Sequence, residues 1–104
     1  MTTAAPELTH PAREDLELSA VLHALSDPVR LQMVRYLAGA GGELSCGSLD
    51  VPVTKSTCTH HFKVLREAGV IAQRQDGRAR LNTLREADLD ARFPGLLKTI
   101  LASA

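Results

Sequence analysis

The sequence has little of the material that several classes of protein require. It contains two cysteines, no tryptophan and only three aromatic residues, namely Tyr36, Phe62 and Phe93. Two cysteines make no disulfide framework of the kind found in small secreted proteins, so we expect their thiols to be reduced by default. With so few aromatic side chains the core must be built mainly from Leu, Val, Ile and Ala, which favours helices.

No signal-peptide pattern opens the chain, and no apolar run approaches the length that spans a bilayer. These two absences predict a cytoplasmic protein with no membrane partner. The chain also lacks a glycine-rich phosphate loop and paired acid/base carboxylates, so we expect it not to be an enzyme. Its 104 residues suffice for one domain with a hydrophobic core, of modest stability as a lone monomer.

The formal net charge is zero, but the charges are unevenly distributed. Residues 1–27 carry one arginine against five acids, a net charge of −4. Residues 54–80 carry six basic residues against two acids, a net charge of +4. Because a polyanion responds to the local field, the basic segment is compatible with a nucleic-acid partner despite the neutral total.

The sequence predicts a flexible N-terminal arm at residues 1–13, followed by one domain at residues 14–104. Apolar spacing predicts four successive helices, at residues 14–25, 28–38, 46–50 and 54–69. The predicted helix at residues 14–25 begins with acidic residues, whose negative charge is favourable at the positive, N-terminal end of the helix dipole. In the second, Asp27 is a suitable N-cap, Pro28 fits the first helical position, and the glycines of residues 39–42 end the helix. We expect Arg30 and Arg35 to point away from its apolar side.

The periodicity changes from helical to alternating after Gly69. Val70 and Ile71 open a strand, Asp76-Gly77 is a strong hairpin signal, and residues 80–84 return as a second strand. Residues 85–90 read as a turn, and residues 95–104 as an apolar terminal helix. The predicted fold class is mainly α with a small β-hairpin, in the order α-α-α-α-β-β-α, dimerising through the first and last helices.

The fourth predicted helix has two chemically different faces. Cys58, His61, Phe62 and Leu65 follow the spacing of one face, which suits packing against a core. The opposite face carries short hydroxyls, an imidazole and an ammonium, from Ser56, Thr59, His60 and Lys63. Such groups reach DNA base edges and phosphates, so we predict a recognition helix in a helix-turn-helix arrangement.

Three strings of the sequence resemble one known family. LSDPVRLQMVRYL, TKSTCTHHFKVLREAGVI and QDGRARLNTL are similar to the D-P-x-R opening, the recognition helix and the G-R wing of the ArsR-type winged helix-turn-helix repressors. The resemblance covers about residues 14–84. It implies a prokaryotic homodimer that binds a palindromic operator in double-stranded DNA, represses transcription, and is released by a signal that the sequence does not identify.

The resemblance also implies which side chains meet the operator. Hydroxyls and His60 are expected near base edges, and lysines and hairpin arginines at phosphates. The predicted DNA-contacting residues are Lys55, Ser56, Thr57, Thr59, His60, Lys63, Arg74, Arg78 and Arg80.

The departures from the family concern the inducer. Many relatives sense metals through a Cys-x-Cys pair ahead of the recognition helix, where this chain has the single thiol of Cys46. One thiolate does not make a three- or four-ligand soft site. Others bind zinc between terminal helices through Asp, His and Glu, and residues 95–104 contain none of these. We therefore expect no metal and no cofactor.

Cys58 and His61 allow several interpretations. They are three residues apart and suit a shared metal ion with Cys46, but the favoured interpretation is structural, with Cys58 as a small core residue and His61 half-buried. A second hypothesis is a redox switch, in which oxidation of Cys58 or its pairing with Cys46 distorts the recognition helix and releases DNA. A Cys-His nucleophile is the least favoured interpretation.

Two further alternatives concern the partner. The neutral total charge and the apolar last helix are compatible with a winged helix that serves only for association with another protein. In that case the arginines of the hairpin would only face solvent at its tip and would contact no DNA. Six bases within residues 54–80 favour DNA over this alternative, and salt-dependent binding to a palindromic duplex separates the two.

Overall fold

Helices and a small sheet alternate along the chain in the computed structural model, which describes residues 8–104. The elements are η1 (Arg13–Asp15), α1 (Leu18–Leu25), α2 (Pro28–Ala40), β1 (Leu44–Ser45), η2 (Cys46–Ser48), α3 (Lys55–Glu67), β2 (Ile71–Asp76), β3 (Ala79–Leu84), α4 (Glu86–Arg92) and α5 (Leu96–Ser103). The predicted class, mainly α with a small hairpin, is confirmed. Within this part of the chain no helix is long and apolar enough to cross a membrane.

Local signals set the starts of the two central helices. The Asp27 carboxylate caps α2, accepting hydrogen bonds from the backbone N–H groups of Val29 at 2.8 Å and Arg30 at 3.1 Å. The Thr54 hydroxyl caps α3 in the same way, accepting from the N–H of Thr57 at 3.3 Å. Helix α2 runs two residues beyond the predicted end and stops at Gly41, whose φ of 65° is left-handed.

The three-stranded antiparallel sheet has the order β1-β3-β2. The predicted hairpin of β2 and β3 is confirmed, and its last pair, Asp76 and Ala79, flanks Gly77, which has a φ of 60°. The strand β1 was not predicted, because two residues are too short to show alternation. Leu44 and Ser45 pair with Asn82 and Leu81 and fix the segment before η2 to the sheet.

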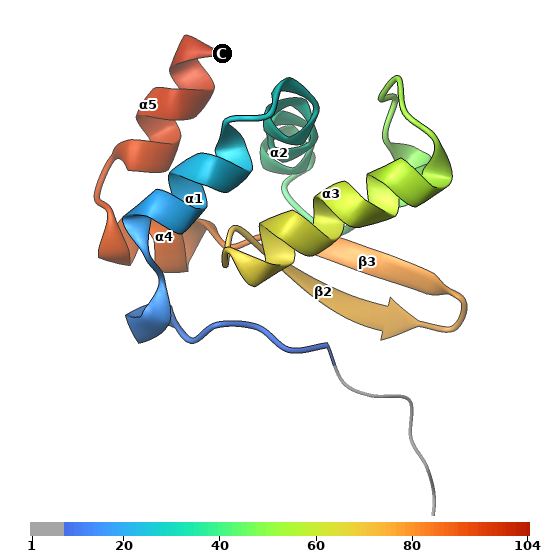
Figure 1. Ribbon diagram of the computed structural model, residues 1–104, viewed down its shortest axis with the longest axis horizontal. Coiled ribbons are helices and arrows are strands. Elements are labelled where there is room, and N and C mark those ends of the chain that lie inside the picture. Colours follow the sequence, from blue (N-terminus) through green and yellow to red (C-terminus); the bar gives the residue numbers. More distant parts are fainter. Residues whose placement is uncertain (1–7) are drawn as a thin grey trace, which may run out of the picture.

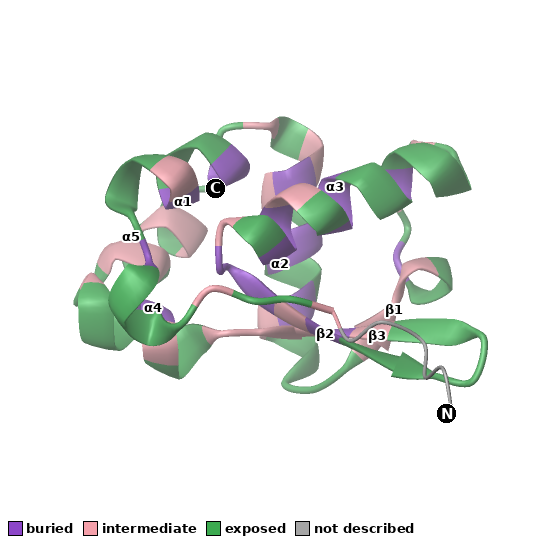
Figure 2. Ribbon diagram, turned by 60° about the horizontal axis from the view of Figure 1, so that its bottom comes forward, coloured by how far each residue is buried: buried purple, intermediate pink, exposed green. Residues whose placement is uncertain are grey.

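The core lies between the helices and one face of the sheet. In Figure 1 α3 lies over β2 and β3, while α1 and α2 lie beside it. Figure 2 shows the buried residues gathered along the inward sides of α1, α2 and α3 and at the start of β2. The buried apolar residues are Leu16, Val21, Ala24, Leu25, Met33, Val34, Leu37, Leu49, Cys58, Phe62, Leu65, Val70, Ile71 and Leu89.

The segment before α1 packs along the end of α3 and the edge of β2. Gly69 has a φ of 84°, and a Cβ there would lie 2.0 Å from Cδ2 of Leu16, so only glycine fits the close approach. His10 accepts a hydrogen bond at Nε2 from the backbone N–H of Gln73 at 2.9 Å. Residues 1–7 of the predicted arm lie outside the described residues.

Three predicted elements differ from the structure. The first helix begins at Leu18, and the acids Glu14 and Asp15 fall in the 3-10 turn before it rather than at its start. The predicted helix at residues 46–50 is only the 3-10 turn η2. The predicted turn at residues 85–90 is mostly helix α4, because the buried side chain of Leu89 anchors one turn and Arg85 binds the Asp88 carboxylate at 2.9 Å.

Candidate nucleic-acid interface

Helix α3 separates its two faces as the sequence predicts. Cys58, Phe62 and Leu65 are each no more than 2% exposed and pack in the core. Every side chain predicted to contact DNA is exposed, in α3 and in the hairpin alike. The helix therefore presents its hydroxyls, imidazole and lysines to solvent while its other face holds it against the molecule.

Several hydroxyls of the first turn of α3 are already engaged within the chain. The Thr54 hydroxyl donates to Oγ1 of Thr57 at 3.0 Å and lies 3.3 Å from Oγ of Ser56, and the Thr59 hydroxyl donates to the carbonyl of Lys55 at 3.0 Å. Among residues 8–104 no hydrogen bond or ion pair engages the side chains of His60 or Lys63. Their polar atoms are therefore free for an external partner.

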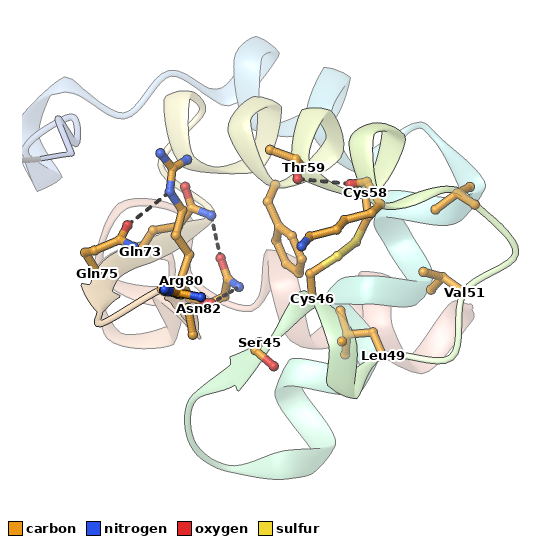
Figure 3. Close-up of a pocket in the computed structure, with 16 residues that line it drawn as sticks. Ser45, Cys46, Leu49, Val51, Cys58, Thr59, Gln73, Gln75, Arg80 and Asn82 are labelled. Atoms are coloured by element: carbon orange, nitrogen blue, oxygen red, sulfur yellow. Dashed lines mark hydrogen bonds between the residues drawn. A yellow bond between two sulfur atoms is a disulfide. The ribbon is translucent and has the colours of Figure 1, made fainter.

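A groove of about 770 Å³ joins the start of α3 to the hairpin and η2. Lys55 and Thr59 line it from α3, and Arg78 and Arg80 from the hairpin, so it brings together four of the side chains predicted to contact DNA. Figure 3 shows Thr59 and Arg80 on different sides of this groove, with the cysteines between α3 and η2. No acidic side chain of the described residues lines it.

Two arginines of the basic segment already have partners within the chain. Arg74 forms an ion pair with Glu43, with Nη2 2.8 Å from a carboxylate oxygen. The hydrogen bond from Arg74 is the largest influence that lowers the pKa of Glu43, so the pair stays charged and its net field is weak. Arg66 is 9% exposed and points inward, so it adds nothing to a surface patch.

Arg66 begins a buried polar chain that connects α3 to the sheet. Its Nη1 donates to Oε1 of Gln73 at 2.9 Å, and Nε2 of Gln73 donates to Oδ1 of Asn82 at 2.6 Å. Asn82 in turn donates to the carbonyl of Leu44 at 3.0 Å. The sequence reasoning missed these residues, although the strand period places Gln73 on the inward face shared with buried Ile71.

Arg30 is buried, which corrects the prediction that it points away from the packed side of α2. It is 8% exposed, and its Nε donates to the carbonyl of Ala24 at the end of α1 at 2.6 Å. Its Nη1 lies 3.2 Å from Nδ1 of His61 on α3. The arginine is buried because the carbonyls that end α1 and the ring of His61 supply acceptors that the sequence pattern of α2 does not show.

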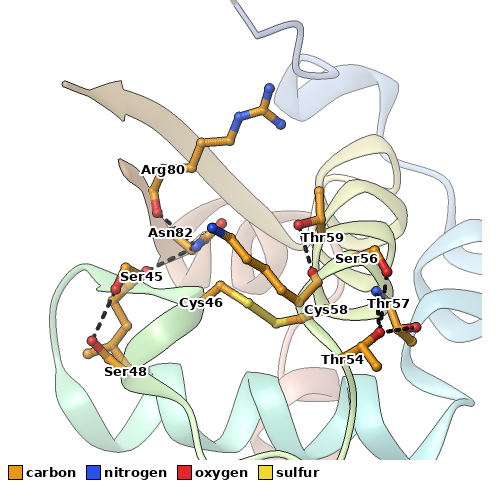
Figure 4. Close-up of a disulfide and its surroundings, with 12 residues drawn as sticks. Ser45, Cys46, Ser48, Thr54, Ser56, Thr57, Cys58, Thr59, Arg80 and Asn82 are labelled. Atoms are coloured by element: carbon orange, nitrogen blue, oxygen red, sulfur yellow. Dashed lines mark hydrogen bonds between the residues drawn. A yellow bond between two sulfur atoms is a disulfide. The ribbon is translucent and has the colours of Figure 1, made fainter. Parts of the chain in front are cut away.

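Cys46 and Cys58 form a disulfide, which corrects the expectation of reduced thiols. Their Cα atoms are 6.6 Å apart, within the usual range for such bonds, because β1 and η2 bring Cys46 beside the first turn of α3. Figure 4 shows the bond bridging the two elements near Thr59 and Asn82. His61, the other inward residue of the sequence hypothesis, is 8% exposed and faces Arg30 rather than the cysteines.

Known proteins resemble this chain over most of its length. A helix-turn-helix domain model matches residues 25–74. The crystal structure of an ArsR family transcriptional regulator superposes with a TM-score of 0.65 over 79% of this chain and 90% of that chain, at 21% identity, which supports the fold. The crystal structure of the transcriptional repressor BigR from Xylella fastidiosa superposes with a TM-score of 0.61 at 33% identity. The match covers 86% of this chain and 96% of that chain.

A curated relative decides the family. The Bacillus subtilis (strain 168) protein YceK, described as an uncharacterized HTH-type transcriptional regulator, is 39% identical over 95 residues, which are 89% of this chain and 95% of that protein. The chain belongs to the ArsR-type winged helix-turn-helix transcriptional regulators. In this ArsR-type regulator α3 is the recognition helix and the hairpin of β2 and β3 is the wing.

Membership of this family answers two questions that the sequence left open. Its members are DNA-binding regulators and not enzymes, so the Cys-His nucleophile is excluded as the function. The alternative of a winged helix used only for protein association is not favoured. DNA is therefore a partner of this ArsR-type regulator.

Proposed function

We propose that this ArsR-type regulator is a homodimeric repressor that acts in the cytoplasm, binds a palindromic operator and leaves it when Cys46 and Cys58 are oxidised. The observation that carries the proposal is the division of α3, whose hydroxyls, His60 and lysines are exposed while Cys58, Phe62 and Leu65 anchor its other face. A helix held in this way presents a rigid polar face to the major groove.

The exposed side chains divide by chemistry into two sets. Short hydroxyls and the His60 ring are suited to base edges, and we assign Ser56, Thr57, Thr59 and His60 to this set. Cationic side chains are suited to phosphates, and we assign Lys55, Lys63, Arg74, Arg78 and Arg80 to that set. Arg74 is the weakest member, because Glu43 already neutralises it.

Apolar surface on α1 and α5 supports the dimer. Leu18 is 46% exposed and Leu22 is 43% exposed, although both are large apolar side chains on one side of α1. No residue of α5 is buried, although Leu97 and Ile100 pack against the core and carry apolar surface to the outside. A second copy that covers these helices would place the two recognition helices in successive major grooves, roughly 34 Å apart.

The cysteine pair supports a redox signal. In the cytosol, disulfides are usually transient and redox-sensing, whereas a structural bond is expected in secreted proteins. Helix α3 is uninterrupted from Lys55 to Glu67 in the bonded state, so we expect the distortion to be a shift in the position of the helix and not a break within it. In our proposal the bond fixes the first turn of α3 to η2, in a position that fits the operator less well.

Operator affinity in the two redox states tests this proposal. A bound duplex is selected from a random pool with dithiol protein, and its dissociation constant is measured by fluorescence anisotropy for the dithiol and disulfide forms. We expect the disulfide form to bind about 5- to 150-fold more weakly, the usual range of coupling between two sites. The Cys46→Ser, Cys58→Ser double variant should bind equally well before and after peroxide. Equal affinity of the two wild-type forms would exclude redox control.

A further inference from the structure

The disulfide lies in a groove whose charged side chains are all basic. Cys46 and Cys58 both line the groove between α3, η2 and the hairpin, and so do Lys55, Arg78 and Arg80. No aspartate or glutamate among residues 8–104 lines it, and the nearby Glu43 is engaged by Arg74. A volume of about 770 Å³ is that of a small-molecule site. Any reagent that reaches the disulfide from this side therefore meets a positive field.

We propose that this groove is a binding site for a small thiol that carries a carboxylate, and that the bound thiol reduces the Cys46–Cys58 disulfide. The inference rests on the redox control proposed above and names the class of molecule that reverses it. The three cations attract the carboxylate, and no carboxylate of the described residues lines the groove to oppose them. The apolar side chains of Leu49 and Phe62 also line the groove, so the carbon chain of a small thiol can pack against them.

Burial decides which sulfur atom is attacked. Cys58 is 2% exposed, whereas Cys46 on η2 is only half-buried. The thiolate therefore attacks Sγ of Cys46, and a new bond joins the two sulfur atoms while the Cys46–Cys58 bond breaks. The electron pair of the broken bond goes to Sγ of Cys58, which lies in the first turn of α3, where the positive end of the helix dipole favours negative charge.

A second thiol completes the reduction. Its thiolate attacks the sulfur of the first thiol in the mixed disulfide, and the disulfide of the two small molecules leaves. The sulfur atoms of Cys46 and Cys58 each take a proton, so two thiols are oxidised and one protein disulfide is reduced. Two electrons pass to the protein and no other reductant is required.

The test compares thiols of different charge on the disulfide form of the full chain, without DNA. The probes are 3-mercaptopropionate, which is anionic, 2-mercaptoethanol, which is neutral, and cysteamine, which is cationic. Reduction is followed by acid quenching, alkylation and mass spectrometry. For each thiol, the rate constant of the Arg80→Gln variant is divided by that of wild type, so that the intrinsic reactivity of the thiol cancels.

We expect Arg80→Gln to slow reduction by 3-mercaptopropionate about threefold and to accelerate reduction by cysteamine by a similar factor, the effect of one charge a few ångströms away in water. The 2-mercaptoethanol rate should not change. Arg35→Gln, which removes the same charge from the exposed surface of α2, should change none of the three rates. Added salt should reduce the difference between the anionic and cationic thiols.

Two results would overturn the inference. One is an equal effect of Arg80→Gln on all three thiols, and the other is a trapped mixed disulfide on Cys58 instead of Cys46. Neither result depends on operator affinity, so they are distinct from a failure of the proposed function. Conversely, equal operator affinity of the two redox forms would exclude redox control while leaving charge-selective reduction in place.

Discussion

The guanidinium of Arg30 and the ring of His61 meet inside the protein, with Nη1 of Arg30 3.2 Å from Nδ1 of His61. A guanidinium has only donors, so Nδ1 of His61 is the acceptor in this contact. Because Nε of Arg30 also donates to the carbonyl of Ala24, one side chain connects the end of α1 to the recognition helix. The helix proposed to form the dimer and the helix proposed to contact DNA thus share a buried contact.

Removal of the Arg30 side chain should destabilise the fold. We expect Arg30→Ala to lower the free energy of unfolding by about 2–3 kcal/mol, because the Ala24 carbonyl and His61 are left without a charged hydrogen-bond donor in a buried site. The control is Arg35→Ala, which removes the same side chain from the exposed side of α2 and should change stability by less than about 0.5 kcal/mol. Urea denaturation measures both. Equal effects would show that burial of Arg30 contributes nothing.

Protonation of His10 should weaken the contact between the N-terminal segment and β2. Burial, followed by the positive charges of Arg66 and Arg85, lowers the pKa of His10 below its usual 6.5. The unfolded chain then binds the proton more tightly, so the stability from His10 is complete above pH 6.5 and is lost as the pH falls through the lower pKa of the folded state.

The matched variants are His10→Gln and His23→Gln, the latter on the exposed side of α1. The difference in unfolding free energy between wild type and His10→Gln should be larger at pH 7 than at pH 5, as measured by urea titration at each pH. For His23→Gln the difference should stay constant. A difference for His10→Gln that grows as the pH falls would contradict the direction of the shift.

A charge on the exposed apolar side of α1 should separate the proposed dimer. We expect Leu22→Glu to weaken association at least about 100-fold, because an unpaired carboxylate would be buried at the interface at a cost of about 3 kcal/mol or more. His23→Glu, on a different exposed side of α1, should leave association unchanged. Sedimentation equilibrium gives both dissociation constants. A Leu22→Glu protein that sediments like wild type would place the interface elsewhere.

Phosphate-binding and base-reading side chains should differ in their response to salt. Lys63→Ala should lower the slope of log affinity against log salt by about 0.9 for each phosphate that the lysine no longer neutralises, or about 1.8 in a dimer. His60→Ala should leave the slope unchanged and reduce the preference for the operator by about 1–3 kcal/mol. Arg35→Ala, exposed on α2, is the control and should change neither quantity. A changed slope for His60→Ala alone would reverse the assigned roles.

Local signals explain which parts of the fold could be predicted. Asp27-Pro28 marks the start of α2 and Asp76-Gly77 the hairpin, because each depends on neighbouring residues alone. Helix α4 was missed because its acids resemble a turn, while its stability comes from burial of Leu89 against distant elements. Elements held by tertiary contacts leave little trace in the local pattern.

The same distinction applies to the site. Helical periodicity was sufficient to place Ser56, His60 and Lys63 on the exposed face of α3, although their DNA contacts are still predictions. The disulfide was not expected, because the path of β1 and η2 decides whether Cys46 reaches Cys58. The groove arises only where η2, α3 and the hairpin meet, so no single stretch of sequence contains it.

Specific, salt-dependent binding by the dithiol protein tests the central claim most directly. Fluorescence anisotropy compares the selected palindromic duplex with a scrambled duplex of equal length and composition between 50 and 200 mM salt. We predict a preference of roughly a thousandfold or more for the palindrome, and binding that weakens steeply as salt rises. Equal binding to both duplexes, or an affinity that does not change with salt, would contradict recognition of an operator by α3 and the hairpin.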